Sequence, residues 1–212
     1  MQRDSEKLNL PRKYLSYTQY DTWIKSKKLY REIYYENKKR FETRESIFGK
    51  NAANLLEKGE YHPLLAKLPK GTHPEYRIET VIEGIPILSF LDSFTPGTNS
   101  IYEVKTGRVP WDQHRVDTHD QLPFYCMAVL SKFGHYDPHV LLAWLETILL
   151  PQTEIISGIT FESKPIVAFT GNLQVFTRFV DESSLQRITE ALVMTADEIS
   201  KDYTEWKEKR GL

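Results

Sequence analysis

The chain has 212 residues, of which 40% are hydrophobic and 27% are charged, and its formal net charge is −1. This length fits one sizeable domain with its own core, and the composition is that of a globular protein rather than a disordered one. No apolar run reaches the roughly 20 residues of a membrane-spanning helix, and the N-terminus lacks the apolar stretch of a secretory signal. A single cysteine excludes an internal disulfide and any four-cysteine metal or iron–sulfur site. We therefore expect an intracellular, cytoplasmic protein without a membrane partner.

Charge is distributed unevenly along the chain. Residues 1–50 carry 13 Lys or Arg and 7 Asp or Glu, whereas the remaining residues carry 15 and 22. A basic N-terminal part could follow phosphates while an acidic cleft elsewhere holds a metal ion. The same basic residues are equally consistent with solvated helix faces, which is the more common use of such runs. The sequence leaves both interpretations open.

Two helices are predicted before residue 60. Ser16, as N-cap, and Gln19, three residues later, form a capping box that starts the first helix. The aromatic residues that follow recur at near-helical spacing, which favours packing over stacking with bases; they are Tyr20, Trp23, Tyr30 and Tyr34. The second helix is predicted over 44–58, where Gly59 ends it. Its apolar face consists of Ile47, Phe48, Ala52, Leu55 and Leu56.

Strands are predicted to follow a Pro-rich loop over 61–74. Segments 77–83 and 85–94 read as a hairpin around Glu83-Gly84, and a third strand is predicted over 101–105, after the turn at Pro96-Gly97. A helix is expected over 116–133, with Pro123 either in an early first turn or at a kink. Gln121 and Tyr125, four residues apart, share one face of this helix.

The second half of the chain continues with apolar segments. Residues 140–145 form an unbroken apolar run, as expected of a strand that is buried on both faces. Further strands are predicted over 154–159, 166–170 and 173–180, and a final helix over 182–206, with Met194 among its apolar positions. The order of elements indicates a single α/β or α+β domain over 1–212, with a helical N-terminal segment over 1–60.

The clearest chemical signal lies at the end of the hairpin and on the strand after it. Side chains alternate along a strand, so Glu103 and Lys105 face the same way while Val104 faces the core. Asp92 ends a strongly apolar run and can meet Glu103 across the strand pair. An unpaired carboxylate in that place needs a ligand. Two carboxylates beside one ammonium group suit a hard divalent cation and metal-dependent phosphodiester cleavage.

These residues, in this order, resemble the PD-(D/E)XK nuclease superfamily, in particular its RecB-like and lambda-exonuclease-like branch. In that branch an Asp ends one strand, a Glu-x-Lys lies on the next, and a following helix carries Gln-x-x-x-Tyr. The matching residues are Asp92, Glu103-Val104-Lys105 and Gln121-Leu122-Pro123-Phe124-Tyr125. The specific motifs lie within 77–130, and a looser likeness extends over most of the chain. The resemblance implies a restriction-endonuclease-like core, with a mixed central sheet flanked by helices.

The resemblance also implies a Mg²⁺- or Mn²⁺-dependent deoxyribonuclease without an iron–sulfur cluster. Asp92, Glu103 and the Val104 carbonyl would hold the metal ion. Lys105 would position water or neutralise charge at phosphorus, while the Gln and Tyr of the helix would orient the lysine or the DNA backbone. The partner would be DNA, and the action exonucleolytic, at ends, in recombination, repair or phage DNA processing. A homo-oligomer, or a recombination or replication partner protein, is compatible with this function.

One departure from the family pattern bears on activity. Many members of the branch place a metal-binding His on an early helix after a Gly, whereas the matching stretch 48–53 has Ala53 at that position. Glu57, one helical turn further on, and Glu79, on the preceding strand, are acidic residues that could replace the missing His ligand, and the sequence favours neither of them. The alternative is therefore a catalytically weak or inactive DNA-binding or scaffold protein with the same fold.

Other residues allow other interpretations. His114 and His119, with aspartates nearby, could form a zinc site, although a spacing of five is poor for a helical ligand pair. Trp111 and Arg115, between the third strand and the next helix, fit substrate contact and packing equally well.

Overall fold

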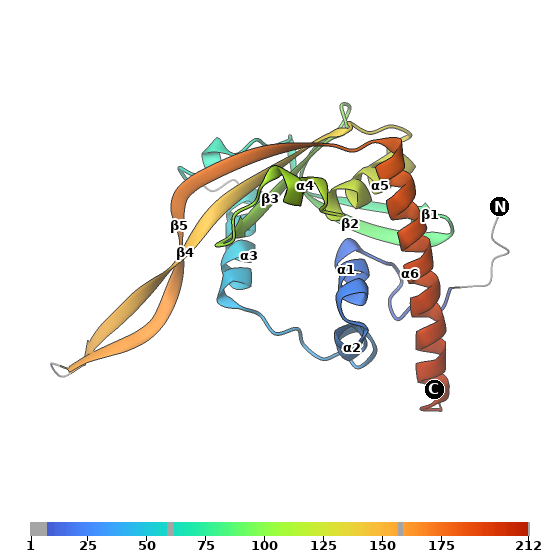
Figure 1. The fold of residues 1–212 in the computed structure, drawn as a ribbon, viewed down its shortest axis with the longest axis horizontal. Helices are drawn as coiled ribbons and strands as arrows, with labels where there is room; N and C mark the ends of the chain where they lie inside the picture. Colours follow the sequence, from blue (N-terminus) through green and yellow to red (C-terminus); the bar gives the residue numbers. More distant parts are fainter. Residues whose placement is uncertain (1–7, 59–61, 157–158, 212) are drawn as a thin grey trace.

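The computed structural model describes residues 8–58, 62–156 and 159–211, including all of their side chains except those of 56–57 and 152–164. Within these residues the centre is a five-stranded sheet in the order β1-β2-β3-β4-β5 (Figure 1). The strands are β1 His73–Ile82, β2 Ile85–Thr95, β3 Ser100–Gly107, β4 His139–Ile156 and β5 Ile159–Phe179. Strands β3 and β4 are parallel and the other neighbours antiparallel, so the predicted mixed sheet is confirmed.

Helices flank this sheet, as predicted. They are α1 Tyr17–Lys25, α2 Lys27–Tyr30, α3 Arg44–Glu57, α4 Gln113–Asp117, α5 Gln121–Phe133 and α6 Glu182–Glu208. A π-helical turn, η1 Arg31–Tyr35, extends α2, and a 3-10 turn, η2 Leu65–Lys67, lies within the predicted loop. Helix α3 lies beside the carboxyl end of β3, whereas α1, α2 and α6 lie together on the other side of the molecule (Figure 1). Among the described residues no helix has the length and apolarity needed to cross a bilayer.

Local sequence explains where the first elements begin and turn. Ser16 caps α1 by accepting a hydrogen bond from the Gln19 N–H at 3.4 Å. The Gln19 side chain donates to the Tyr14 carbonyl instead of closing a capping box, so only the N-cap is confirmed. Strands β1 and β2 meet at the predicted turn, where Glu83 and Gly84 have φ values of 48° and 76°. Both values lie in the left-handed region that a two-residue hairpin turn of type I′ requires.

The helix predicted over 116–133 is two helices in the structure. Pro123 lies in the first turn of α5, where its missing N–H costs nothing. In a continuous helix its ring would clash with the carbonyl of His119. That carbonyl instead accepts a hydrogen bond from the buried Arg178 guanidinium at 2.6 Å, and the Val116 carbonyl accepts another at 3.2 Å. Both carbonyls also accept a backbone N–H, from Leu122 at 3.3 Å and from His119 at 3.2 Å respectively, so the arginine gives each a second donor at the break.

The strands predicted separately over 140–145, 166–170 and 173–180 form one long ribbon with the described part of the strand predicted over 154–159, of which residues 157–158 lie outside the described residues. Strands β4 and β5 pair from His139↔Phe179 to Ile156↔Ile159, and the ribbon extends beyond the rest of the fold (Figure 1). Its register shifts between Leu145 and Thr147 and again between Leu150 and Gln152. Pro151, Pro165 and Gly171 lie at these irregularities, between the separately predicted strands.

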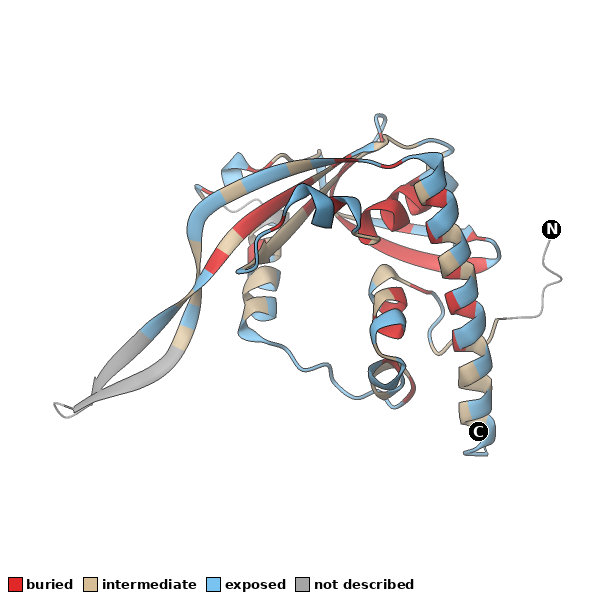
Figure 2. Ribbon diagram, in the orientation of Figure 1, coloured by how far each residue is buried: buried red, intermediate tan, exposed pale blue. Residues whose placement is uncertain are grey.

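The core occupies both faces of the sheet (Figure 2). The larger cluster joins the N-terminal helices, α5 and α6 to the sheet; its members include Trp23, Tyr30, Phe94, Phe124 and Ile188. The smaller cluster joins Leu64, Leu65 and Leu68 to Ala143 and Leu145 of β4. Residues 142–145 alternate between the two clusters, so the prediction of a strand buried on both faces is confirmed.

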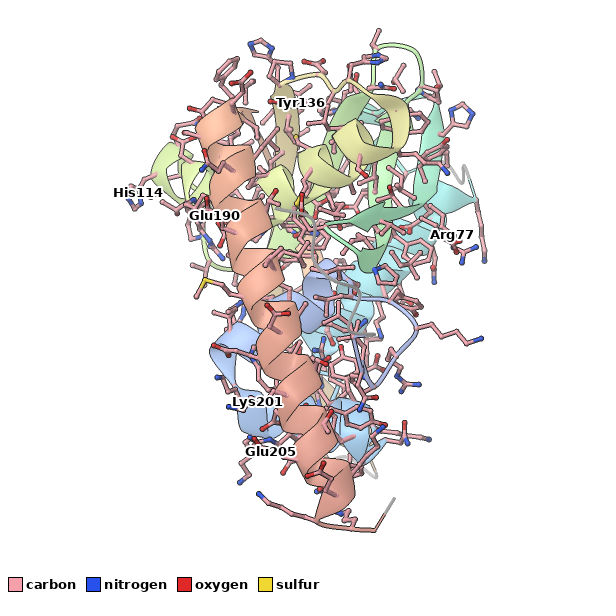
Figure 3. The ribbon with its side chains drawn as sticks, turned by 90° about the vertical axis from the view of Figure 1, so that its right-hand side faces the viewer. Arg77, His114, Tyr136, Glu190, Lys201 and Glu205 are labelled. Carbon is pink, nitrogen blue, oxygen red and sulfur yellow. The ribbon has the colours of Figure 1, made fainter. Side chains whose placement is uncertain are left out.

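The N-terminal aromatic residues pack in the core, as predicted. Tyr20, Trp23 and Tyr30 are each at most 5% exposed, and the Trp23 indole N–H donates to Glu198 of α6 at 2.9 Å. Helix α6 is amphipathic: its outer face carries Glu190, Lys201 and Glu205, while Leu185, Ile188, Leu192 and Ile199 are buried (Figure 3). Met194 is 65% exposed, so its predicted place in the apolar face is wrong.

Candidate active site

Strands β2 and β3 separate at Asp92. Their pairing runs from Thr95↔Ser100 to Ser93↔Tyr102, and the next opposed positions are Asp92 and Glu103. In place of a backbone carbonyl, the Asp92 carboxylate accepts the Val104 N–H at 2.8 Å. The side chain thereby satisfies a backbone donor that the widening of the sheet releases. The structure thus places Asp92 against the Glu-x-Lys segment, as the motif predicts.

A chain of hydrogen bonds links β3 to α5. The Lys105 ammonium group donates to Glu103 Oε1 at 2.5 Å and to Gln121 Oε1 at 2.6 Å. The Gln121 amide then donates to the Tyr125 hydroxyl at 2.6 Å. Glu103 and Lys105 share a face of β3 because they are two residues apart, and Gln121 and Tyr125 share a face of α5 because they are four apart. The structure therefore brings these four predicted residues into contact.

Burial sets the electrostatics of the two carboxylates. Glu103 is 2% exposed, and burial raises the pKa of its carboxyl from 4.5 to about 8; repulsion from Asp92 adds to the rise and Lys105 opposes it. Burial also raises the pKa of the Asp92 carboxyl, again against the attraction of Lys105. Glu103 Oε2 is buried and has no hydrogen-bond partner in the described structure. A buried carboxylate oxygen without a donor is costly, and a cation would offset that cost.

His119 completes the surroundings of Gln121. Its Nε2 lies 3.1 Å from Gln121 Oε1, and its ring meets those of Tyr17 and Trp111 edge-on. Burial, helped by the nearby Lys105 charge, lowers the pKa of His119 to about 4. The imidazole is therefore neutral near pH 7, and its Nε2–H can donate to the same amide oxygen that the lysine uses.

A cavity of about 300 Å³ opens beside this cluster. Its lining combines α3 with β1, β2 and β3: Gly49, Lys50, Ala52, Ala53, Glu75, Asp92, Val104, Lys105 and Thr106. Helix α3 approaches closely because residue 49 is a glycine; a Cβ there would lie 2.9 Å from Thr106 Oγ1. Ala53 faces the cavity, so the position where the family pattern has His does reach the site.

The residues of the cluster are of the chemical type that binds a hard divalent cation, but they are not arranged as a complete ligand set. Among the described residues, no group of three or more His, Cys, Asp or Glu side chains is already arranged to hold a metal ion. The donors present are nevertheless of the right kind, since Mg²⁺ and Mn²⁺ prefer oxygen ligands. Glu103 Oε2, which has no donor, and Asp92 both belong to the cluster beside the cavity.

The other sequence candidates lie apart from this cluster or serve in packing. His114 is exposed on α4 and projects from the surface (Figure 3), away from the buried contacts of His119, so the two do not form a zinc site. The Arg115 guanidinium stacks on the Trp111 ring at 4.1 Å and also donates to nearby carbonyls. Glu79 is exposed and paired with Arg77, and the Glu57 side chain lies outside the described part of the chain.

Glu75 is the residue that sequence reasoning missed. It lies on β1 and lines the cavity together with Asp92, and its φ of 45° is unusual for a side chain other than glycine. The predicted loop over 61–74 ends before the glutamate and the predicted hairpin begins at 77, whereas β1 already begins at His73; no motif marks the glutamate. Only the register of β1 against β2 reveals its position.

Comparisons with known proteins give fold-level matches. No protein-family model and no curated protein matches the sequence. A solved structure from Eubacterium rectale, described as a candidate exonuclease, aligns with a TM-score of 0.56 at 12% identity, over 96% of this chain and 88% of its own.

Two further structures align with lower scores. A phage-related exonuclease from Haemophilus somnus 129PT gives a TM-score of 0.47 at 12% identity, over 82% of this chain and 79% of its own. An alkaline exonuclease from Laribacter hongkongensis gives 0.45 at 10% identity, over 94% of each chain. At such identities the likeness concerns the fold. The chain therefore has the mixed-sheet α/β fold of the exonuclease-like protein from Eubacterium rectale, in agreement with the fold that its motifs imply.

Proposed function

We propose that the chain is a metal-dependent deoxyribonuclease whose active site is the cluster beside the α3 cavity. The observation that carries this proposal is the meeting of Asp92, Glu103 and Lys105 in one cluster, in which the buried Glu103 Oε2 has no hydrogen-bond partner among the described residues. Burial of such an oxygen is unfavourable, and a bound cation would offset that cost. The fold shared with a candidate exonuclease supports the same class of reaction.

The oxygens of Asp92 and Glu103, with the Val104 carbonyl, would hold Mg²⁺ or Mn²⁺. When bound, the ion supplies positive charge that polarises a phosphate and favours the ionisation of water. Lys105 is the cation that the chain itself provides, and its side chain is 25% exposed at the cavity. Its ammonium group can neutralise the negative charge that grows on the phosphoryl oxygens as the phosphodiester bond breaks.

Gln121 and Tyr125 orient the lysine in this scheme. The Gln121 amide oxygen accepts from Lys105, and its amide nitrogen donates to Tyr125, so the amide can face only one way. Because Gln121 and Tyr125 are both buried on α5, the helix holds the ammonium group in a fixed direction. A lysine that is already oriented loses less conformational entropy on reaching the transition state, which lowers the activation free energy of the cleavage.

Residues 1–212 would act as one nuclease domain that includes its N-terminal helices. Trp23 and Tyr30 belong to the same core cluster as Ile188 of α6, and Lys27 pairs with Glu198. We further propose DNA as the substrate and cleavage from ends, in recombination, repair or phage DNA processing.

End-labelled linear DNA and covalently closed circular DNA, each with Mg²⁺ or Mn²⁺, test the proposal. Wild-type protein is expected to degrade the linear DNA only, and EDTA, Glu103→Gln and Lys105→Ala are each expected to abolish the reaction. Cleavage of circles as well would retain the nuclease and reject the dependence on ends. A matched control is Lys132→Ala, which removes an exposed charge at the far end of α5.

A second candidate function is a DNA-binding or scaffold protein with little or no activity. Ala53 favours it, because α3 presents no side-chain ligand to the cavity at that position. Binding of DNA and metal by the wild type, without cleavage of any DNA, would establish this alternative.

A further inference from the structure

The cavity beside the catalytic cluster is unevenly supplied with oxygen ligands. On the α3 side it is lined by Gly49, Lys50, Ala52 and Ala53, none of which has a side-chain oxygen. On the sheet side two carboxylates line it, from Asp92 and from Glu75. A hard cation bound by Asp92 and Glu103 would therefore have a further acidic side chain available from β1, whereas α3 contributes none to the cavity lining.

The register of the hairpin brings Glu75 to Asp92. Pro74 pairs with Ser93 and Tyr76 with Leu91, which leaves Glu75 and Asp92 opposite each other. The pairing is interrupted at this point, where Glu75 has a φ of 45°. A glutamate in the left-handed region is strained, and such strain persists where the surrounding structure imposes it, most often at functional sites.

The charge of Glu75 also reaches the buried part of the cluster. Its repulsion contributes to the raised pKa of Glu103 and to the raised pKa of Tyr125. Carboxyl groups that lie near one another disfavour each other's ionisation, and a divalent cation bound among them would remove this penalty. Among the described residues these side chains are not already arranged as metal ligands, and Glu103 Oε2, which is buried and has no hydrogen-bond donor there, belongs to the same cluster.

We propose that Glu75 is a third acidic ligand of the metal site, supplied by β1 in the place where α3 offers only small side chains. The inference rests on the proposed function, since it concerns the same metal ion. It differs from the residues that the sequence motifs identify, because Glu75 is brought to the site by strand register and by an unusual backbone conformation. It also removes the main reason for regarding the chain as an inactive scaffold, since the ligand missing at Ala53 is replaced.

Titration of the purified, EDTA-treated protein with Mn²⁺ tests this inference without any substrate. Affinity is measured by isothermal calorimetry and by the electron paramagnetic resonance signal of free Mn²⁺, for wild type, Glu75→Gln, Glu103→Gln and Glu79→Gln. Glu79 is the matched control, because it lies on the same strand but is exposed and paired with Arg77. We expect Glu75→Gln to weaken Mn²⁺ binding at least tenfold, Glu103→Gln to abolish it, and Glu79→Gln to leave it unchanged.

The melting temperatures of the metal-free proteins show whether each variant is folded, so that a loss of Mn²⁺ binding is not mistaken for a loss of fold. Glu75→Gln is expected to melt cooperatively and close to the wild-type temperature, because the substitution keeps the size of the side chain. If Glu75→Gln binds Mn²⁺ as tightly as the wild type while Glu103→Gln does not bind it, the inference is overturned and the proposed function stands. If the wild type binds no Mn²⁺, the proposed function fails and the inference fails with it.

Discussion

Replacing Glu103 by glutamine is expected to stabilise the metal-free protein at alkaline pH while removing its nuclease activity. The carboxyl is buried, and its pKa rises from 4.5 to about 8 in the folded protein. Between these two values the folded state holds the proton and the unfolded state does not. The stabilisation that this proton provides is therefore complete below about pH 4.5 and is lost as the pH rises through 8.

The size of the effect follows from the shift. One pKa unit corresponds to about 1.36 kcal/mol, so the loss of this proton lowers the free energy of unfolding by about 3 kcal/mol between pH 5 and pH 8. Burial also raises the pKa of Asp92, and this contribution has the same sign. Glutamine at 103 keeps the shape of the side chain and has no proton to lose.

Urea unfolding of the wild type and of Glu103→Gln, in EDTA and at several values from pH 5 to pH 8, measures this difference. The wild type is expected to lose stability steeply over the range, and the variant to lose clearly less. Excess Mn²⁺ should reverse the order at pH 8, because it stabilises only the protein that binds it. Equal pH dependence in the two proteins would refute the reasoning, since it would mean that Glu103 is ionised in the folded state at neutral pH.

Further predictions concern positioning and packing around the site. Gln121→Leu removes the acceptor of Lys105 and is expected to lower kcat on linear DNA about 10²-fold with an unchanged circular dichroism spectrum; full activity would show that the lysine needs no such partner. Arg178→Met removes one of two donors from each of the Val116 and His119 carbonyls and should cost about 1 kcal/mol in urea unfolding, and a neutral result would contradict its role at the helix break. Gly49→Ala forces a Cβ to 2.9 Å from Thr106 Oγ1 and should cost about 1 kcal/mol, which a second substitution, Thr106→Ala, should restore.

The central residues of the site were predictable from the sequence because they depend on short-range geometry. Glu103 and Lys105 must share a face of any strand, and Gln121 and Tyr125 a face of any helix. Their contact across β3 and α5 then requires only the order of elements that the apolar pattern indicates. The roles of these residues in catalysis remain a proposal.

What the sequence could not provide depends on long-range register. Glu75 reaches the cavity only because β1 pairs with β2 so that it stands opposite Asp92. The β4–β5 ribbon was divided in the prediction into four separate strands, whereas the pairing continues past Pro151 and Pro165, which fall where the register shifts. Local propensity cannot anticipate such irregularities, because the pairing with a distant strand determines them.

The hydrogen bond from the Val104 N–H to the Asp92 carboxylate gives the protein an intrinsic probe of its own site. Most amides in a sheet donate to a neutral carbonyl, but this one donates to a group whose charge changes on protonation and on coordination. The chemical shift of the Val104 amide proton, followed by NMR in ¹⁵N-labelled protein, should therefore move with pH and with the addition of a diamagnetic ion such as Mg²⁺. A single backbone resonance would then report the state of the carboxylate directly, without substrate or substitution.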